Sequence, residues 1–166
     1  MYEKIKFIKY IMLKIIIATV SNTPGVLTRV SSLLRKRNFN IISLTVAPMI
    51  DKNFSKMIIK LEVDIDSVQV SKHLHKLIDV LKVVSYNLND LILHESLFLK
   101  VNATRATRAE ILQFSSIYNA TIVNLNEKEI IFKYSEHPDK IDEFIEVMTP
   151  FGIRDIVRSG VTAIGK

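Results

Sequence analysis

The same order of apolar and polar segments occurs twice along the chain, and this repeat constrains the fold more than any other feature. In the first half an unbroken apolar run, Ile15–Val20, lies in a predicted strand at about 13–20 and precedes a glycine-containing turn and an amphipathic helix. Strands at about 40–47 and 55–63, a second helix and a strand at about 80–87 follow. The order strand-helix-strand-strand-helix-strand is typical of a ferredoxin-like (split βαβ) domain. The predicted fold class is therefore α+β.

The first predicted helix begins at the string Asn22-Thr-Pro-Gly25. Pro24 suits a first helical turn because it has no N–H to leave unpaired, and Asn22 or Thr23 is expected to cap the helix. Asn38 is expected to end it in a left-handed conformation. Apolar residues at three-to-four spacing define the predicted inward face: Val26, Leu27, Val30, Leu33 and Leu34.

The strand at 55–63 alternates apolar and charged residues, which predicts a sheet with one covered face. The second helix is expected to take Asp66 or Ser67 as its cap and to turn four apolar residues inward: Val70, Leu74, Leu77 and Ile78.

The second half repeats the order after a short polar break at 87–90, the predicted linker. We expect strands near 96–101 and from Ile153, a hairpin of 120–124 with 129–134, and helices near 108–118 and after Pro138. The predicted inward residues of these helices are Ile111, Leu112, Ile117, Ile141, Phe144, Ile145 and Met148. The predicted boundaries are an extension at 1–11, expected to be disordered or an over-called start, a first domain at 12–87 and a second at 91–166.

Composition excludes several classes of site. The chain has 166 residues, a net charge of +6 and no cysteine, so disulfides, thiol nucleophiles and cysteine-ligated metals are excluded. The four glycines are too few for the glycine-rich pattern of a Walker loop or of a dinucleotide-binding fingerprint. His73 and His75, two apart on a predicted helix, lie on different faces, and His94 and His137 have no obvious carboxylate nearby. No catalytic residues and no metal site are therefore predicted.

The remaining composition favours a soluble, intracellular protein with no membrane span. The most apolar stretch, 11–20, is short for a span and contains Lys14. The one basic cluster, 35–37, fits a solvated helix end, with a phosphate or partner contact as the alternative.

The turn that ends in Gly25 is the candidate ligand site. The first amides of a helix lack partners, and the helix dipole favours negative charge there, so the turn suits a carboxylate. Gly25 leaves the backbone accessible, and Asn40 at the start of the next strand supplies amide donor and acceptor groups. Turn and capping chemistry alone also accounts for the string. The ligand that this turn favours is a small amino acid, bound and not transformed.

Four strings carry a resemblance to a known family. They are Asn22-Thr-Pro-Gly-Val-Leu-Thr-Arg-Val30, Asn38-Phe-Asn-Ile-Ile-Ser-Leu-Thr-Val-Ala-Pro48, His75-Lys-Leu-Ile-Asp-Val-Leu-Lys-Val83 and Arg158-Ser-Gly-Val-Thr-Ala163. The chain from Met12 to Lys166 resembles the small, regulatory subunit of acetolactate synthase (acetohydroxyacid synthase). Two features depart from the family pattern: Asn38 replaces a frequent glycine, and family chains tend to begin at the position of Met12. Detection of the Met1 peptide by mass spectrometry of the natively expressed protein would contradict an over-called start.

The resemblance implies a homodimer with an N-terminal ACT domain and a C-terminal ferredoxin-like domain. It implies a catalytic subunit as partner, which carries thiamine diphosphate, magnesium and flavin, while this chain carries no cofactor. The complex makes the first shared intermediates of valine, leucine and isoleucine synthesis, and the small subunit raises activity and confers inhibition by valine. The implied compartment is the cytoplasm, or the stroma for a plastid-encoded chain.

In the family, valine lies where two ACT domains meet. Carried over to matching positions, its carboxylate faces the backbone of Gly25 and Val26, and Asn22 and Asn40 bind its polar ends. Two alternatives stay open: an ACT-domain sensor of another pathway, and an RNA-binding protein that stacks bases on Phe132 and Tyr134. We expect neither nucleic acid nor membrane as a partner.

Overall fold

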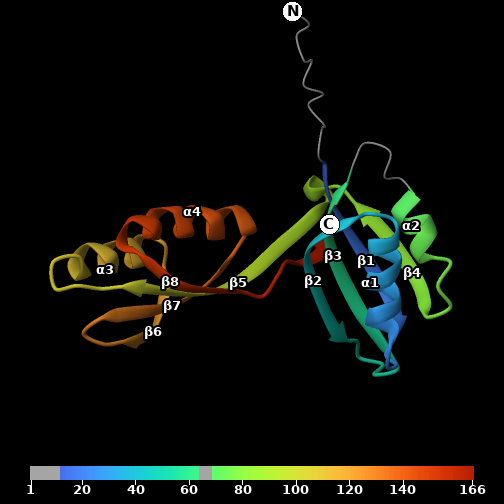
Figure 1. The fold of residues 1–166 in the computed structure, drawn as a ribbon, viewed down its shortest axis with the longest axis horizontal. Coiled ribbons are helices and arrows are strands. Elements are labelled where there is room, and N and C mark those ends of the chain that lie inside the picture. The colour runs from blue at the N-terminus through green and yellow to red at the C-terminus, as the bar shows by residue number, and fades with distance from the viewer. Residues whose placement is uncertain (1–11, 64–68) are drawn as a thin grey trace, which may run out of the picture. The chain divides into compact units, whose positions relative to one another are not determined.

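The computed structural model describes residues 12–63 and 69–166, and they form two antiparallel sheets, each with two helices on one face (Figure 1). The first half contains β1 (Met12–Ser21), α1 (Val26–Lys36), β2 (Asn40–Pro48), β3 (Phe54–Val63), α2 (Gln69–Leu74) and β4 (Val80–Tyr86). The second contains the 3-10 helix η1 (Leu88–Asp90), β5 (Leu91–Asn102), α3 (Arg108–Ile117), β6 (Thr121–Leu125), β7 (Glu129–Glu136), α4 (Pro138–Met148), the 3-10 helix η2 (Thr149–Phe151), β8 (Ile153–Arg158) and β9 (Thr162–Gly165).

The strand orders are β2-β3-β1-β4 and β6-β7-β5-β8, with β9 also paired to β5. In both sheets the first and third strands of the unit are central, and the second and fourth are edges, as the ferredoxin-like order requires. The predicted α+β class and the repeated fold are confirmed.

Each sheet packs its helices over a separate core. The first core contains Ile16, Ala18, Val20, Val26, Val30, Leu34, Met57, Ile59, Leu61, Val70, Leu74, Val80 and Val83. The second contains Leu97, Leu99, Val101, Ala103, Ile111, Ile130, Phe132, Tyr134, Ile141, Phe144 and Met148. Burial of these side chains is the main stabilising contribution to each unit, at about 25 cal/mol for each Å² of apolar surface removed from water.

The described chain divides into two compact units. One ends at Ile92 and takes in Gly165–Lys166, and the other spans Leu93–Ile164. The chain therefore passes from one unit to the other inside β5, two residues after that strand begins. The predicted linker at 87–90 forms one turn of 3-10 helix just before this point.

Three predictions about inward-facing residues are wrong. Ile78 is 96% exposed because α2 ends at Leu74, after which the helical spacing no longer applies. Ile117 is 64% exposed at the last position of α3, and Leu27 is also exposed. The predicted cap residues of α2 and the extension at 1–11 lie outside the described residues.

Two predictions of strand extent also differ from the structure. β5 begins at Leu91, five residues before the predicted start, and β9 was not predicted. The prediction for Asn38 is confirmed, since its φ is 60° and its N–H donates to the carbonyl of Arg35 at 2.9 Å.

Candidate functional site

The turn between β1 and α1 ends in a left-handed glycine. Gly25 has φ 86°, a conformation that residues with a Cβ rarely adopt. It is the residue before the first turn of α1, and no side chain caps that turn. The predicted capping by Asn22 or Thr23 is therefore wrong, because the helix starts at Val26 and its cap position has no side chain. The N–H of Val26 donates to the carbonyl of Thr23 at 3.4 Å, and the next two amides of α1 have no hydrogen bond to a described residue, so they face the space outside the turn.

Asn22 anchors the turn to the neighbouring loop. Its Nδ2 donates to the carbonyl of Lys52 at 2.9 Å, and its backbone N–H donates to the carbonyl of Asn53 at 2.7 Å. Its Oδ1 has no hydrogen bond to any residue that the structure describes. Asn22 therefore offers an acceptor to a ligand, while its donors hold the backbone. The side chain of Val26 is buried in the core, and its N–H donates to the carbonyl of Thr23 at 3.4 Å within the turn.

Arg29, which the sequence analysis did not single out, lies over Gly25. A Cβ built on Gly25 would come within 3.0 Å of Arg29 Nη1. The other guanidinium atoms pair with Asp79: Nε is 2.5 Å from Oδ2, and Nη2 is 2.9 Å from Oδ1. The backbone carbonyl of Asp79 also accepts the N–H of Ser21 at 2.8 Å. Asp79 thus fixes the guanidinium beside the turn through two hydrogen bonds.

The electrostatics of this turn favour an anion. α1 has no acidic residue in its first turn, and Arg29 adds a cation where the helix dipole is already positive. An arginine near the start of a helix, where the helix dipole disfavours a cation, is the signal in the sequence that could have identified this residue. Asp79 offsets part of the charge, and Nη1 remains beside Gly25 as a donor.

The structure does not bring Asn40 to this turn within one chain. Asn40 pairs with Glu62 on β3, whereas Ser21 pairs with Phe54 at the other end of β3. The two ends are eight residues of strand apart, or roughly 26 Å at about 3.3 Å per residue. Asn22, Gly25 and Val26 therefore form one group, and Asn40 lies at the opposite end of the sheet.

Asn40 instead belongs to a second, open hollow at the C-terminal end of α1. Its Nδ2 donates to Glu62 Oε2 at 2.8 Å. The hollow, of about 580 Å³, is lined by Ser31, Ser32, Arg35, Asn38, Phe39, Asn40 and Ile41. Because β2 is an edge strand, this hollow lies where a second chain can approach.

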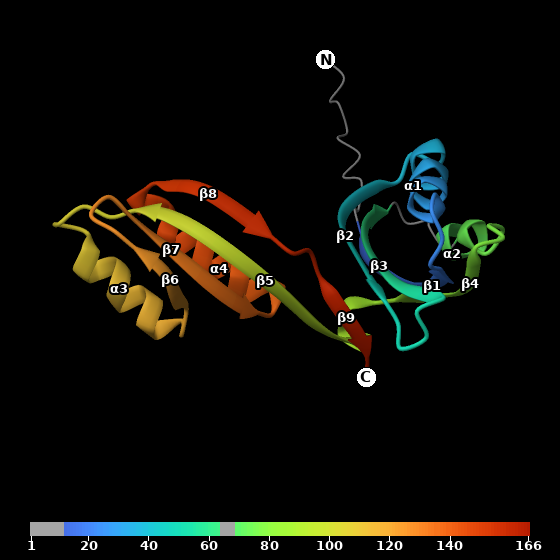
Figure 2. The same ribbon diagram turned by 90° about the horizontal axis from the view of Figure 1, so that it is seen from below.

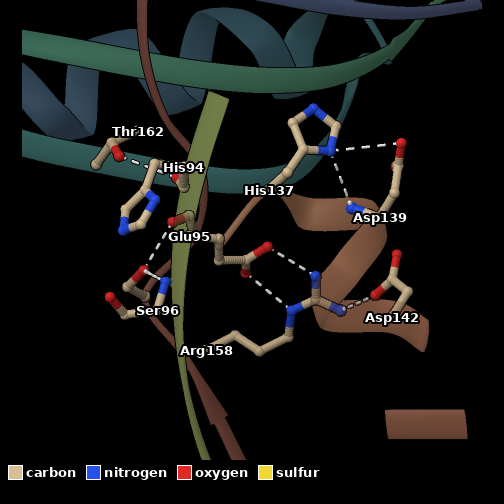
Figure 3. A network of polar contacts seen from close by, with 10 residues as sticks. His94, Glu95, Ser96, His137, Asp139, Asp142, Arg158 and Thr162 are labelled. Atoms are coloured by element: carbon tan, nitrogen blue, oxygen red, sulfur yellow. Dashed lines mark hydrogen bonds and ion pairs between the residues drawn. The ribbon is translucent and has the colours of Figure 1, made fainter. Parts of the chain in front are cut away.

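The second unit contains an ion pair whose carboxylate is buried and whose guanidinium side chain is 35% exposed (Figure 3). Arg158 donates to both carboxylate oxygens of Glu95, Nε to Oε1 at 2.8 Å and Nη2 to Oε2 at 2.7 Å, and its Nη1 donates to Asp142 at 2.7 Å. These contacts raise the pKa of Arg158 above its usual range. Glu95 is 3% exposed, and such a charge is tolerated only when it is paired. Arg158 and its two acidic partners therefore connect β5, β8 and α4, and the paired carboxylate of Glu95 is not available as a general base.

The histidines form no metal site with other side chains of the described residues. No group of three or more histidine, cysteine or acidic side chains able to hold a metal occurs within residues 12–63 and 69–166. The prediction that His137 lacks a carboxylate neighbour is wrong, because its Nδ1 is 3.4 Å from Asp139 Oδ2 and accepts the N–H of Asp139 at the start of α4. Partial burial, Arg37 and Lys76 lower the pKa of His73.

The aromatic residues considered for base stacking are buried. Phe132 is fully buried and Tyr134 is 6% exposed, and both pack against Phe144. Neither ring is free to stack on a base, which removes the residues on which that alternative depended.

Comparisons with known proteins cover both units. The family profile described as "AHAS small subunit-like ACT domain" matches residues 16–82, and the one described as "Small subunit of acetolactate synthase" matches residues 94–166. The acetolactate synthase small subunit of Mycolicibacterium smegmatis is 34% identical over 148 residues, which span 89% of this chain and 87% of that protein. The chain belongs to the acetolactate synthase small-subunit family.

Other members of the small-subunit family agree. The acetolactate synthase small subunit of Bacillus subtilis is 34% identical over 157 residues, spanning 93% of this chain and 91% of that one. The crystal structure of the small subunit from Thermotoga maritima has a TM-score of 0.85 at 25% identity, covering 93% of this chain and 97% of that chain. The first unit is an ACT domain, as the resemblance implied. No helix among the described residues is long and apolar enough to cross a bilayer.

Proposed function

We propose that this chain is the non-catalytic regulatory subunit of acetolactate synthase, which binds and activates the catalytic subunit and confers inhibition by valine. The observation that carries the ligand part is the left-handed Gly25 beside Arg29 Nη1 at the start of α1. In this proposal thiamine diphosphate, magnesium and flavin belong to the catalytic subunit, in the cytoplasm or a plastid stroma. The pathway is valine, leucine and isoleucine synthesis.

The chemistry of the turn supports valine as the effector. Its carboxylate accepts hydrogen bonds from the two unpaired amides of α1 that follow Val26 and from Arg29 Nη1, and its ammonium donates to Asn22 Oδ1. Charge-assisted hydrogen bonds of this kind contribute about 1.5–3 kcal/mol each. Burial of the isopropyl group contributes about 1.5–3 kcal/mol more, which favours valine over alanine but separates it weakly from leucine.

A homodimer paired through β2 supplies the missing Asn40. When two copies of an edge strand pair antiparallel about a two-fold axis, the start of each strand lies opposite the end of the other. The end of β2, at Pro48, is level with Ser55 on β3 and so with the β1 end that leads to Asn22 and Gly25. This pairing carries Asn40 of one copy toward the Gly25 turn of the second. We propose two equivalent valine sites at this contact.

Inhibition then follows from a difference in affinity. Valine affects the catalytic subunit only if it binds one arrangement of the dimer more tightly than another. The coupling is reciprocal and typically about 1–3 kcal/mol, so the catalytic subunit changes valine affinity by the same factor.

The test is acetolactate formation by the cognate catalytic subunit, with and without this chain, across a valine titration. We expect the chain to raise activity and valine to lower it in a saturable manner. No change in activity at any concentration of the chain would refute the activating role. Activation that valine leaves unchanged would refute the effector assignment and would favour a purely activating subunit.

A further inference from the structure

The open face of the first sheet carries a grid of lysine and apolar side chains. α1 and α2 cover the other face (Figure 2). On β1, Thr19 lies between Lys56 of β3 and Lys82 of β4, and Ile17 lies between Ile58 and Val84. Lys60 is beside Ile15 one step further along, where the face is covered, since Ile15 is 0% exposed. Residues next to them in sequence, such as Met57 and Val83, belong to the core, so these side chains project from the opposite side.

The lysines of this face have no partner of opposite charge in the part of the chain that the structure describes. Lys56 and Lys82 are exposed, and none of Lys56, Lys60 and Lys82 forms an ion pair or side-chain hydrogen bond to a described residue. Two strand spacings separate Lys56 from Lys82, or roughly 10 Å between Cα atoms. Their positive charges therefore reinforce one another across Thr19. The acid on the same face, Glu62, lies at its far end and accepts a hydrogen bond from Asn40.

The composition of the two units shows the same asymmetry. Basic residues outnumber acidic ones in residues 12–92, while acidic residues outnumber basic ones in 93–164. Within the first unit the open face combines an apolar centre, in which Ile17 and Val84 are half-buried and Ile58 is buried, with charged side chains at its rim. Protein interfaces have this anatomy, with an apolar centre inside a polar rim.

We propose that the face formed by Thr19, Ile17, Val84, Lys56 and Lys82, here named the lysine face, binds an acidic surface of the catalytic subunit. This inference rests on the proposed function. A second copy of the same face is a poor occupant, because stacking would set lysines against lysines. Nucleic acid is also disfavoured, because the central positions on β1 and β3 hold isoleucines where single-stranded RNA needs exposed aromatic rings.

Charge reversal tests the lysine face against a matched control. The double variant Lys56→Glu/Lys82→Glu changes the face, and Lys72→Glu/Lys76→Glu makes the same charge change at exposed positions in and just after α2, on the helical side of the unit. Both full-length variants are titrated into the catalytic subunit at low and moderate salt. We expect the face variant to raise the concentration for half-maximal activation about tenfold or more, and the control to change it less than about twofold. Wild-type binding should weaken with salt, and the face variant should lose most of that dependence.

The outcomes are separable. A face variant that activates as the wild-type chain does would overturn the lysine face and leave the proposed function intact. An equal loss of activation in the control variant would also overturn the lysine face, because the loss would then follow from net charge alone. Unchanged valine affinity and thermal midpoint in the face variant exclude misfolding as the cause. If the wild-type chain does not activate the catalytic subunit, the proposed function fails. Sedimentation of the mixed subunits then tests whether the lysine face binds the catalytic subunit. A face variant that forms the same complex as the wild-type chain would overturn the lysine face.

Discussion

Gly25→Asp should abolish valine binding and leave activation largely intact. The new carboxylate would lie where the effector's carboxylate is proposed to bind, and it would find a partner already in place, because a Cβ at position 25 comes within 3.0 Å of Arg29 Nη1. The variant therefore fills the site with its own anion. Its backbone must adopt φ 86°, which is unfavourable for residues with a Cβ by about 1–2 kcal/mol and less so for aspartate and asparagine.

The magnitude follows from the contacts that are lost. Two charge-assisted hydrogen bonds to the carboxylate, at about 1.5–3 kcal/mol each, amount to about 3–6 kcal/mol. Since about 1.4 kcal/mol corresponds to a tenfold change in affinity, valine should bind at least about a hundredfold more weakly. Like-charge repulsion between the introduced carboxylate and the carboxylate of the ligand acts in the same direction.

Titration calorimetry with valine measures the affinity, and acetolactate formation measures activation. Gly25→Asn is the matched control, since asparagine has the same shape and tolerates a left-handed backbone but adds no charge. We expect Gly25→Asn to retain more valine affinity than Gly25→Asp. Unchanged affinity in Gly25→Asp would place the effector elsewhere, and equal losses in both variants would show that backbone shape, and not charge, decides binding.

Four further predictions follow from the same contacts. Arg29→Met should weaken valine binding about tenfold, since it removes a charged donor, and should lower the thermal midpoint only modestly, because the Arg29 side chain is 46% exposed although Asp79 is 14% exposed; calorimetry that finds wild-type affinity contradicts the role of Arg29. Asn40→Ala should cost more free energy of valine binding, measured by calorimetry, than free energy of unfolding. A mixed dimer of one Asn40→Ala chain and one Gly25→Asp chain should keep one intact valine site, because the unchanged Gly25 and the unchanged Asn40 then meet at the same contact. A site built within one chain would leave no intact site in this mixed dimer. Arg158→Met should destabilise the second unit by about 3 kcal/mol in denaturant unfolding, because it leaves the buried carboxylate of Glu95 unpaired; an unchanged unfolding midpoint would show that water or another group replaces the guanidinium. Burial, with Glu136, raises the pKa of Tyr134, so its contribution to stability is complete below the unfolded pKa of about 10 and is lost as the pH rises through the higher folded pKa; Tyr134→Phe should flatten the alkaline fall in thermal midpoint, and an identical fall in both proteins would contradict this.

Local patterns in the sequence predicted the features that depend on neighbouring residues. Alternation and helical spacing placed β3 and α1, and the tolerance of asparagine for a left-handed backbone identified Asn38 as the end of α1. The pattern failed where an element stopped early, as at Ile78, because a helical face has no meaning beyond the last helical residue.

Features that join distant parts of the chain were beyond local reasoning. Arg29 gains its position from Asp79, fifty residues later, so its role beside Gly25 appears only in three dimensions. The early start of β5 likewise depends on distant partners, since β9 pairs with it. The location of Asn40 differs most from the expectation for the candidate site. The expectation failed because adjacency of two segments in sequence does not determine which end of a sheet each segment occupies.

The last two residues of the chain belong to the unit that is built mostly from its first half. The N–H of Lys166 donates to the carbonyl of Asp90 at 3.1 Å, and its Nζ donates to the carbonyl of Asn89 at 2.7 Å, while Gly165 lies against the ring of Tyr86. A gene fragment that stops near residue 92 would therefore omit contacts of the ACT domain, and a purification tag fused to the C-terminus would be attached beside them. Dissection of this protein into halves should keep the terminal dipeptide with the first unit or replace its contacts.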